Sequence, residues 1–161
     1  MNPVMSADQD EPFLKSIHQA ARVSRIETQI FTVTKPEAIP ATFAAIKRGR
    51  VDGVLVRADP NVLEPNLTNV VAQALKLRLP AMYPWRFYVE AGGLMSYATS
   101  VPDIHRRSAT YVSRILRGEN PSALPVELPT KFELAINLKT AKVLGLTIPQ
   151  SILLRADQII Q

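Results

Sequence analysis

One short apolar run, VDGVLVRADP (residues 51–60), constrains the fold of this chain more than any other stretch. Its apolar residues are nearly continuous: Val51, Val54, Leu55 and Val56. Such a run is typical of a strand that is buried on both faces of a parallel sheet. Helix-like segments flank the run on both sides. We therefore expect residues 51–57 to form an interior strand of an α/β sheet, with ligands binding beyond its carboxyl end.

The rest of the chain continues the alternation of helices and strands. Apolar spacing and capping residues predict helices over residues 8–25, 36–49, 62–77, 84–89, 102–118 and 138–144. Strand patterns cover residues 28–33, 51–57, 81–83, 94–97 and 132–136. Residues 120–129 contain three prolines and predict an extended connector. The expected fold class is α/β, with a mainly parallel open sheet flanked by helices.

Composition excludes several classes of protein. With 161 residues, 47% of them hydrophobic, the chain is long enough to bury a real core. It contains no cysteine, which excludes disulfides, thiolate metal sites and a cysteine nucleophile. No apolar run is long enough to span a membrane. The first residues, MNPVMSADQDEP, have neither the basic start nor the apolar core of a signal peptide.

The charge balance is basic, with 19 lysines and arginines against 14 acidic residues and a net charge of +5. A basic balance is one feature of proteins that bind nucleic acid. In this chain, however, the basic residues are scattered along several predicted helices, as on ordinary solvated faces. We therefore expect no nucleic-acid partner, and a basic nucleic-acid binder is the weakest of three functional alternatives.

No set of residues indicates catalysis, a metal site or a cofactor. His18 and His105 lie in separate predicted helices without the spacing of a zinc motif. Polar and aromatic side chains do gather where predicted strands end, which is where open α/β sheets bind ligands. The candidate ligand-binding residues are Arg57, Asp59, Tyr83, Trp85, Ser96 and Tyr97.

Two of these positions allow a structural as well as a functional interpretation. Trp85 and the adjacent Arg86 offer a flat apolar surface and a fork for a carboxylate, but Trp85 could equally pack under the next helix. Arg57 and Asp59 could hold an amino-acid zwitterion, or Asp59 could cap the helix that follows.

Three stretches together resemble the substrate-binding proteins of bacterial ABC importers, in the subfamily whose fold is similar to the type I periplasmic binding proteins. They are PAMYPWRFYVEAGGLMSYATS (residues 80–100), RRSATYVSRILRGENPSALPVE (106–127) and PTKFELAINLKTAKVLGLTIPQSILLRAD (129–157). The resemblance covers nearly the whole chain, and the last stretch is the most specific. Residues 1–4 also resemble an Asn-Pro loop of that family. Phe87 departs from the family, which often has an acidic residue there.

The resemblance implies a binding protein without catalysis or cofactors, located in the periplasm or at the cell surface. Its ligand would be a small organic solute such as an amino acid, and its partners would be the permease subunits of the importer. Family members have two lobes and about twice this length. By analogy, residues 1–91 and 125–161 are expected to form the second lobe, and residues 92–124 a segment returning to the first, in a truncated protein.

The predicted helix over residues 102–118 carries an apolar stripe made of Ile104, Tyr111, Val112, Ile115 and Leu116. If this stripe evolved to cover another lobe, it would be left open in a single lobe. Uncovered apolar faces and strand edges favour association, so we expect a homodimer. The alternative from a different functional class is a stand-alone α/β regulatory or interaction domain that has lost solute binding.

Overall fold

The computed structural model describes residues 7–161, with side chains described from residue 12 onward. Residues 1–4, the Asn-Pro stretch of the resemblance, lie outside the described residues. The described chain divides into two compact units, Met1–Thr32 and Val33–Gln161.

The first unit consists of helix α1 (Ala7–Val23) and an extended segment. The Nδ1 atom of His18 lies 2.9 Å from the hydroxyl oxygen of Thr28, which links the helix to the segment that follows it. The predicted strand over residues 28–33 is wrong. Its sequence favours a strand, but it pairs with no strand among the described residues, and Ile30 is exposed. A strand needs a neighbour that completes its hydrogen-bond ladder.

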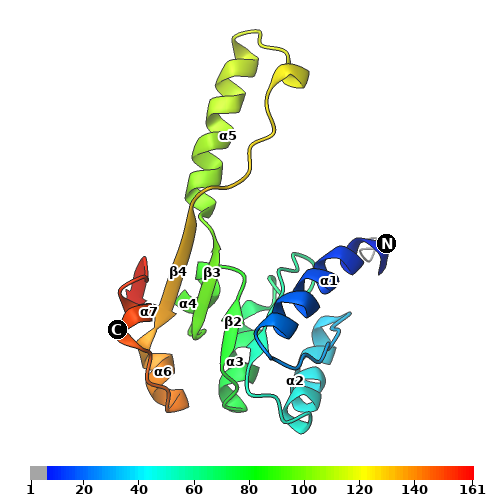
Figure 1. Cartoon of the computed structure of the whole chain (residues 1–161), viewed down its shortest axis with the longest axis vertical. Coiled ribbons are helices and arrows are strands. Elements are labelled where there is room, and N and C mark those ends of the chain that lie inside the picture. The colour runs from blue at the N-terminus through cyan, green and yellow to red at the C-terminus, as the bar shows by residue number, and fades with distance from the viewer. Residues whose placement is uncertain (1–6) are drawn as a thin grey trace. The chain divides into compact units, whose positions relative to one another are not determined.

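The second unit is built on a five-stranded sheet, seen near the centre of Figure 1. The strands follow chain order across the sheet: β1 (Val54–Leu55), β2 (Ala81–Tyr83), β3 (Met95–Thr99), β4 (Phe132–Asn137) and β5 (Gln158–Ile160). Neighbouring strands are parallel, except that β3 and β4 are antiparallel. The predicted fold class, an α/β fold with a mainly parallel sheet flanked by helices, is confirmed.

The helices of this unit mostly match the predicted segments. They are η1 (Pro36–Ala38), α2 (Ile39–Arg48), α3 (Leu67–Lys76), α4 (Arg86–Glu90), α5 (Val101–Leu116), η2 (Pro121–Ala123), α6 (Leu138–Leu144) and α7 (Gln150–Leu153). Helix α3 begins five residues later than predicted, because residues 60–66 form turns instead. None of the helices in the described part of the chain is both long and apolar enough to cross a membrane.

Strand β1 corrects the prediction that residues 51–57 form an interior strand. It contains only two residues and lies at one end of the sheet, paired with β2 alone. The Val54 and Val56 amides donate to the carbonyls of Pro80 and Met82, on the β2 side. Val56 is buried, but Leu55 is 57% exposed. The apolar run predicts a strand that is buried on both faces and lies inside the sheet. In the structure one face of the strand is open at Leu55, and within the described residues the strand pairs with β2 alone.

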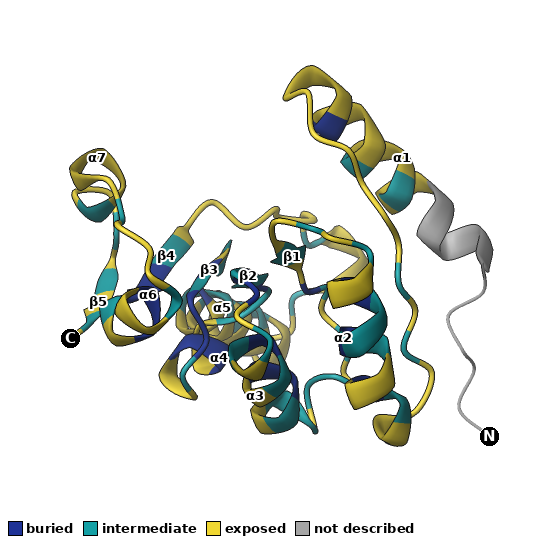
Figure 2. Cartoon of the chain, turned by 90° about the horizontal axis from the view of Figure 1, so that it is seen from below, coloured by how far each residue is buried: buried dark blue, intermediate teal, exposed yellow. Residues whose placement is uncertain are grey.

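The core of the unit lies between one face of the sheet and the helices α2, α3 and α4, which lie on the same side of it (Figure 2). Tyr83, Ser96 and Ala135 occupy neighbouring register positions on this face and are buried. Tyr88 and Val89 of α4 pack here with no exposed surface. The short helix α4 is therefore central to the core despite its five residues.

The turn from β4 into α6 matches its prediction. The Asn137 side chain accepts a hydrogen bond from the Thr140 amide at 3.1 Å, which caps the first turn of the helix. Gly145 ends the helix with a φ of 73°, a conformation that glycine adopts without strain. The Thr140 hydroxyl also donates to the Gly92 carbonyl at 2.7 Å, which fastens α6 to the loop after α4.

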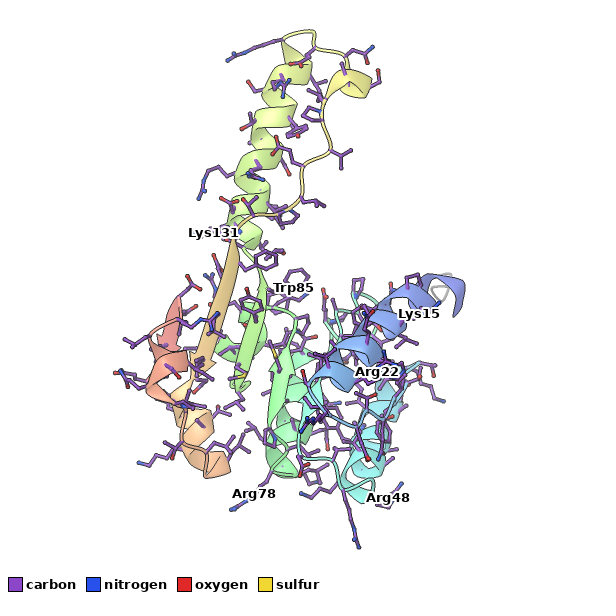
Figure 3. All side chains as sticks on the ribbon, in the orientation of Figure 1. Lys15, Arg22, Arg48, Arg78, Trp85 and Lys131 are labelled. Carbon is purple, nitrogen blue, oxygen red and sulfur yellow. The ribbon has the colours of Figure 1, made fainter. Side chains whose placement is uncertain are left out.

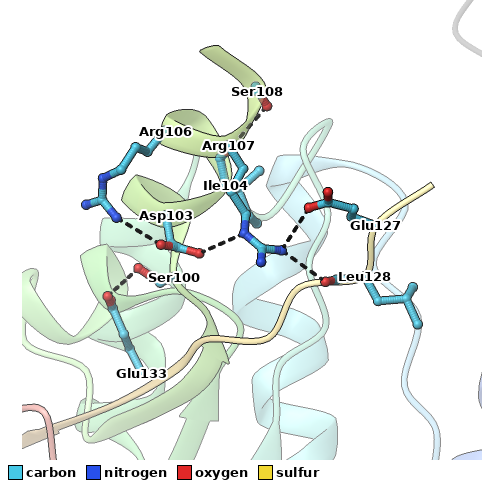
Figure 4. A network of polar contacts seen from close by, with 9 residues as sticks. All are labelled: Ser100, Asp103, Ile104, Arg106, Arg107, Ser108, Glu127, Leu128 and Glu133. Carbon is cyan, nitrogen blue, oxygen red and sulfur yellow. Dashed lines mark hydrogen bonds and ion pairs between the residues drawn. The ribbon is translucent and has the colours of Figure 1, made fainter. Parts of the chain in front are cut away.

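Residues 101–131 leave the sheet between β3 and β4 and form an arm, made of α5 and the segment that returns beside it (Figure 1). No residue of α5 is buried. Tyr111 donates its hydroxyl hydrogen to the Pro125 carbonyl at 2.7 Å. At the base of the arm, Arg107 contacts Asp103, Glu127 and the Leu128 carbonyl (Figure 4). Polar contacts therefore hold the arm together.

Candidate ligand-binding site

A cavity of about 190 Å³ lies between α4, the face of the sheet that α4 covers and the start of α5. Its lining includes aromatic, acidic and basic side chains: Trp85, Arg86, Phe87, Glu90, Ser96 and Glu133. Trp85 follows the carboxyl end of β2 (Figure 3), and it lines the cavity together with Val101 and Pro102 at the base of the arm. This is the edge at which an open parallel sheet binds ligands.

Trp85 is held in place by a series of hydrogen bonds that begins at Asp59, shortly after β1. The Asp59 carboxylate accepts hydrogen bonds from the Asn61 and Val62 amides, each at 2.8 Å, and the Asp59 carbonyl accepts one from the Glu64 amide. The Glu64 carboxylate then accepts the indole N–H of Trp85 at 2.8 Å. Asp59 and Trp85 therefore lie at the same edge of the sheet, and Asp59 shapes the turn that carries the partner of Trp85.

Ser96 and Tyr83 occupy paired positions on β3 and β2, on the face that α4 covers. Ser96 is 1% exposed and lines the cavity. Tyr83 lies deeper, stacked on Tyr88 with ring centroids 5.1 Å apart. Gly93 makes this arrangement possible, because a Cβ atom there would lie 2.6 Å from the Tyr83 ring. Tyr83 thus supports the site from beneath and is not part of its lining.

Tyr97 points to the opposite face of the sheet from Ser96, because successive residues of a strand alternate. It is 54% exposed and stacks on Phe132, with ring centroids 5.7 Å apart. Arg57 is half-buried just beyond β1. Of the six predicted residues, the structure therefore brings Trp85 and Ser96 into one cavity. It places Asp59 behind Trp85, and Tyr97 on the far face.

The polar side of the cavity is a charged cluster centred on Arg86. The Arg86 Nε atom lies 3.0 Å from Glu90, and its Nη1 atom lies 3.8 Å from Glu133. Glu133 also accepts a hydrogen bond from the Ser100 hydroxyl, just before α5 begins (Figure 4). One guanidinium therefore faces two carboxylates at the mouth of the cavity.

The two tyrosines beneath the cavity have raised pKa values because they are buried. Burial raises the pKa of Tyr83 well above its ordinary value, and the nearby Tyr88 raises that pKa further. Burial likewise raises the pKa of Tyr88, with smaller contributions from Glu64 and Asp59. The Tyr88 hydroxyl makes no hydrogen bond within the described residues. Both phenols therefore stay neutral across the physiological range.

Sequence reasoning did not include Glu64, Glu90 and Glu133 among the candidates. Two of them left a signal. Glu90 stands four residues after Arg86, the spacing at which opposite charges meet on a helix. Glu133 is the charged residue in the alternating strand FELAIN, where period two places it on the same face as Ala135. Glu64 left none, because the turn that aims it at Trp85 depends on tertiary structure.

Comparison with known proteins identifies the family to which this chain belongs. The family model described as ABC transporter substrate binding protein matches residues 5–160. The chain belongs to the ABC transporter substrate-binding protein family. Among curated protein sequences, none is significantly similar to the chain.

Solved structures of similar proteins agree with this family. A conserved domain protein from Vibrio cholerae O1 is 26% identical, with a TM-score of 0.82 over 92% of this chain and 49% of that one. The ABC domain from Streptococcus pneumonia, solved in complex with L-Trp, is also 26% identical, with a TM-score of 0.83 over 97% of this chain and 54% of that one. This member of the substrate-binding family therefore spans about half the length of both proteins.

A third structure shows the same fold at lower identity. It is the ligand-free, open form of a substrate-binding protein with adhesive properties from Clostridium difficile. It is 17% identical, with a TM-score of 0.68, and the alignment covers 98% of this chain and 52% of that one.

In the described part of the chain, no group of three or more His, Cys, Asp or Glu side chains is arranged to hold a metal ion.

Proposed function

We propose that this chain is the solute-binding component of an ABC importer and binds a small organic solute, such as an amino acid, without catalysing a reaction. The observation that carries this proposal is the cavity beside Trp85 and Ser96, at the carboxyl edge of the sheet, in a member of a substrate-binding family. The pneumococcal relative, solved with L-Trp, supports a solute of this size and chemistry.

The lining of the cavity suits recognition rather than chemistry. Trp85 and Phe87 supply apolar surface, and their rings stack with centroids 6.4 Å apart. Ser96 supplies a hydroxyl, and three charged side chains surround the mouth. Ligand sites commonly combine apolar walls with a few fixed polar groups in this way. Tyr83 lies beneath the cavity, and Asp59 shapes the turn that carries Glu64, the partner of Trp85. Arg57 lies just beyond β1, and Tyr97 lies on the opposite face of the sheet, so neither lines this cavity.

We also propose the division into lobes that the family resemblance implies. Residues 1–91 and 125–161 form a second lobe, and residues 92–124 include the segment that returns to a first lobe. The arm supports this division, because α5 has an apolar stripe but no buried residue. Contact with permease subunits and a location in the periplasm or at the cell surface follow from the same family membership.

The exposed face of the arm also supports a homodimer. Leu116 is 81% exposed, Val112 53% and Ile115 40%. Val126 and Leu128, on the returning segment, are 96% and 78% exposed. Within the described residues, α5 packs only against the returning segment, and the two together leave this apolar surface exposed. Most helical stability in proteins comes from tertiary packing of the apolar face, so a second copy that covers this face would stabilise the helix. Light scattering at micromolar concentration should show a dimer, and Leu116→Glu should convert it to a monomer. A clean monomer without the substitution would exclude the dimer.

A thermal-shift screen of amino acids and small carboxylates tests solute binding directly. At least one compound should raise the melting temperature in a concentration-dependent manner, because ligands that bind only the native state stabilise it. Trp85→Ala should abolish that shift, while Leu128→Ala, on the arm, should not. The competing function is a stand-alone regulatory or interaction domain. It would be favoured if no compound binds and the chain instead associates with a partner protein through the arm.

A further inference from the structure

The charge of Arg86 is already balanced by carboxylates of the protein. Its Nε atom lies 3.0 Å from Glu90, and its Nη1 atom forms a longer ion pair with Glu133, at 3.8 Å. The attraction of Arg86 for the carboxylate of a solute is therefore reduced, because two like charges already face it. With two carboxylates facing one guanidinium, this cluster instead carries one excess negative charge.

The amino end of α5 is the second feature that would favour an anion, and it is also occupied. Val101 and Pro102, the first residues of α5, line the cavity. The positive end of a helix dipole attracts negative charge. Asp103 lies in that first turn, and Glu133 accepts the hydroxyl hydrogen of Ser100 at the N-cap position. The protein's own carboxylates therefore neutralise this end of the helix.

Two carboxylates, Glu90 and Glu133, lie at the mouth of the cavity. The indole N–H of Trp85 is already donated to Glu64. Ser96, only 1% exposed, lines the cavity. Ionised carboxylates only accept hydrogen bonds. A solute that pairs with Glu90 and Glu133 must therefore bring the donors.

The aromatic walls favour the same kind of solute. Phe87 stacks on Trp85 and on Tyr88, which gives an apolar wall for the body of the solute, and an open face of an aromatic ring also attracts cations. At about 190 Å³ the cavity is smaller than the roughly 300–1,000 Å³ typical of a site that encloses a drug-sized ligand. It therefore has room for one end of a solute.

We propose that this cavity selects the cationic end of its solute: a protonated amine joined to an apolar or aromatic body, with no requirement for a carboxylate. Glu90 and Glu133 provide the negative charge, Ser96 provides a hydrogen-bonding hydroxyl, and Trp85 and Phe87 cover the apolar part. This inference rests on the proposed solute-binding function and narrows its substrate class.

A series of three compounds with the same aromatic body tests the selection of charge. Phenethylamine is a cation, L-phenylalanine a zwitterion and 3-phenylpropionate an anion at neutral pH. Isothermal titration with the full chain should show phenethylamine binding tightest, about tenfold tighter than 3-phenylpropionate, because its ammonium makes charge-assisted hydrogen bonds. Equal or tighter binding of L-phenylalanine or 3-phenylpropionate would overturn the inference.

The broader screen separates the two proposals. If an amino acid or small carboxylate binds while phenethylamine does not, the inference is wrong and the solute-binding function stands. If no compound binds at all, both proposals fail.

Two substitutions assign the effect to the cavity. Glu133→Gln and Glu90→Gln should each weaken phenethylamine binding about tenfold and leave 3-phenylpropionate no weaker. Glu90 is the safer variant for folding, because its side chain is 46% exposed. Glu119→Gln, in the arm, removes the same charge away from the cavity and should leave phenethylamine binding unchanged. Wild-type phenethylamine binding in folded Glu90→Gln and Glu133→Gln would contradict the proposal.

Discussion

The sheet with its covering helices and the arm are stabilised in opposite ways, although both belong to the unit formed by residues 33–161. Helix α4 has five residues, yet Tyr88 and Val89 within it have no exposed surface. Helix α5 has 16 residues and buries none of them. Length and amphipathicity therefore do not determine how much a helix contributes to a core. Its position against a sheet determines it.

The two regions also differ in what holds them together. Around α4, apolar contacts and buried hydrogen bonds dominate, including the bond that the Asn137 side chain donates to the Val89 carbonyl. In the arm, the contacts are solvent-exposed ion pairs such as Arg107 with Glu127 and Arg114 with Glu119. Exposed ion pairs contribute little to stability, whereas buried apolar groups contribute much. We therefore expect the arm to open locally before the sheet unfolds.

The largest difference should appear when matched isoleucines are truncated. Ile136 is fully buried in β4, and Ile115 is 40% exposed in α5. Ile136→Ala should lower the free energy of unfolding by about 3 kcal/mol, since it leaves a cavity in the core. Ile115→Ala should lower it by less than about 1 kcal/mol. Urea denaturation measures both, and similar losses would show that the arm is part of the core.

Matched glycines should give the next largest difference. At Gly93, a methyl group would lie 2.6 Å from the Tyr83 ring and 2.7 Å from the Tyr88 carbonyl oxygen. At Gly118, nothing lies within 4 Å, and only the φ of +95° opposes an alanine. Gly93→Ala should cost about 2–3 kcal/mol through overpacking, and Gly118→Ala about 1 kcal/mol through backbone strain. Thermal unfolding compares the two variants. The reverse order would show that the packing around Tyr83 readily relaxes.

The same contrast explains which parts of the fold were predictable. Local signals found the elements: Asn137 and Gly145 mark the ends of α6, and the spacing of apolar residues marks α5. Pairing was not a local property. Residues 28–33 and the run around Val54 have similar strand propensity, yet only the second has a neighbouring strand in the described structure.

The candidate site, like the fold, was only partly predictable from the sequence. The rule that ligands bind at carboxyl ends of strands indicated Trp85 and Ser96, which do line one cavity. It could not distinguish the two faces of β3, and so it grouped Tyr97 with Ser96. It also treated Arg86 as a free fork, because its partner Glu133 is distant in the sequence and meets it only through the folded sheet.

A smaller effect is expected within the arm itself. Arg107 joins α5 to the returning segment through Glu127 and the Leu128 carbonyl, whereas Arg106 contacts Asp103 on its own helix. Arg107→Ala should increase the backbone mobility of residues 126–128, measured by NMR relaxation, and Arg106→Ala should not. Neither should change global stability by more than about 1 kcal/mol. Unchanged mobility in Arg107→Ala would show that other contacts hold the arm closed.

The smallest effect at neutral pH is that of tyrosine ionisation on stability. Burial raises the pKa values of Tyr83 and Tyr88. Their neutral forms are favoured in the folded state, so this stability is fully present below the ordinary phenol pKa of about 10. It is lost as pH rises through the folded-state values, because unfolded phenols ionise first. Phenolate absorbance should show Tyr83 and Tyr88 ionising late, together with unfolding. Desolvation and the neighbouring Glu127 also raise the pKa of Tyr111, which lies in the arm. Ionisation of Tyr83 and Tyr88 near pH 10, with the fold intact, would contradict this burial.

The most direct test of the whole account is to locate bound solute by following the backbone and indole amide signals of the chain in a two-dimensional NMR titration. The probe is the compound with the largest thermal shift. The signals of the Trp85 indole and of the amides of residues 86–90, 96 and 133 should shift together and saturate, while those of residues 108–126 should not. Saturable shifts confined to the arm, or none near Trp85 and Ser96, would contradict the assignment of solute binding to this edge of the sheet.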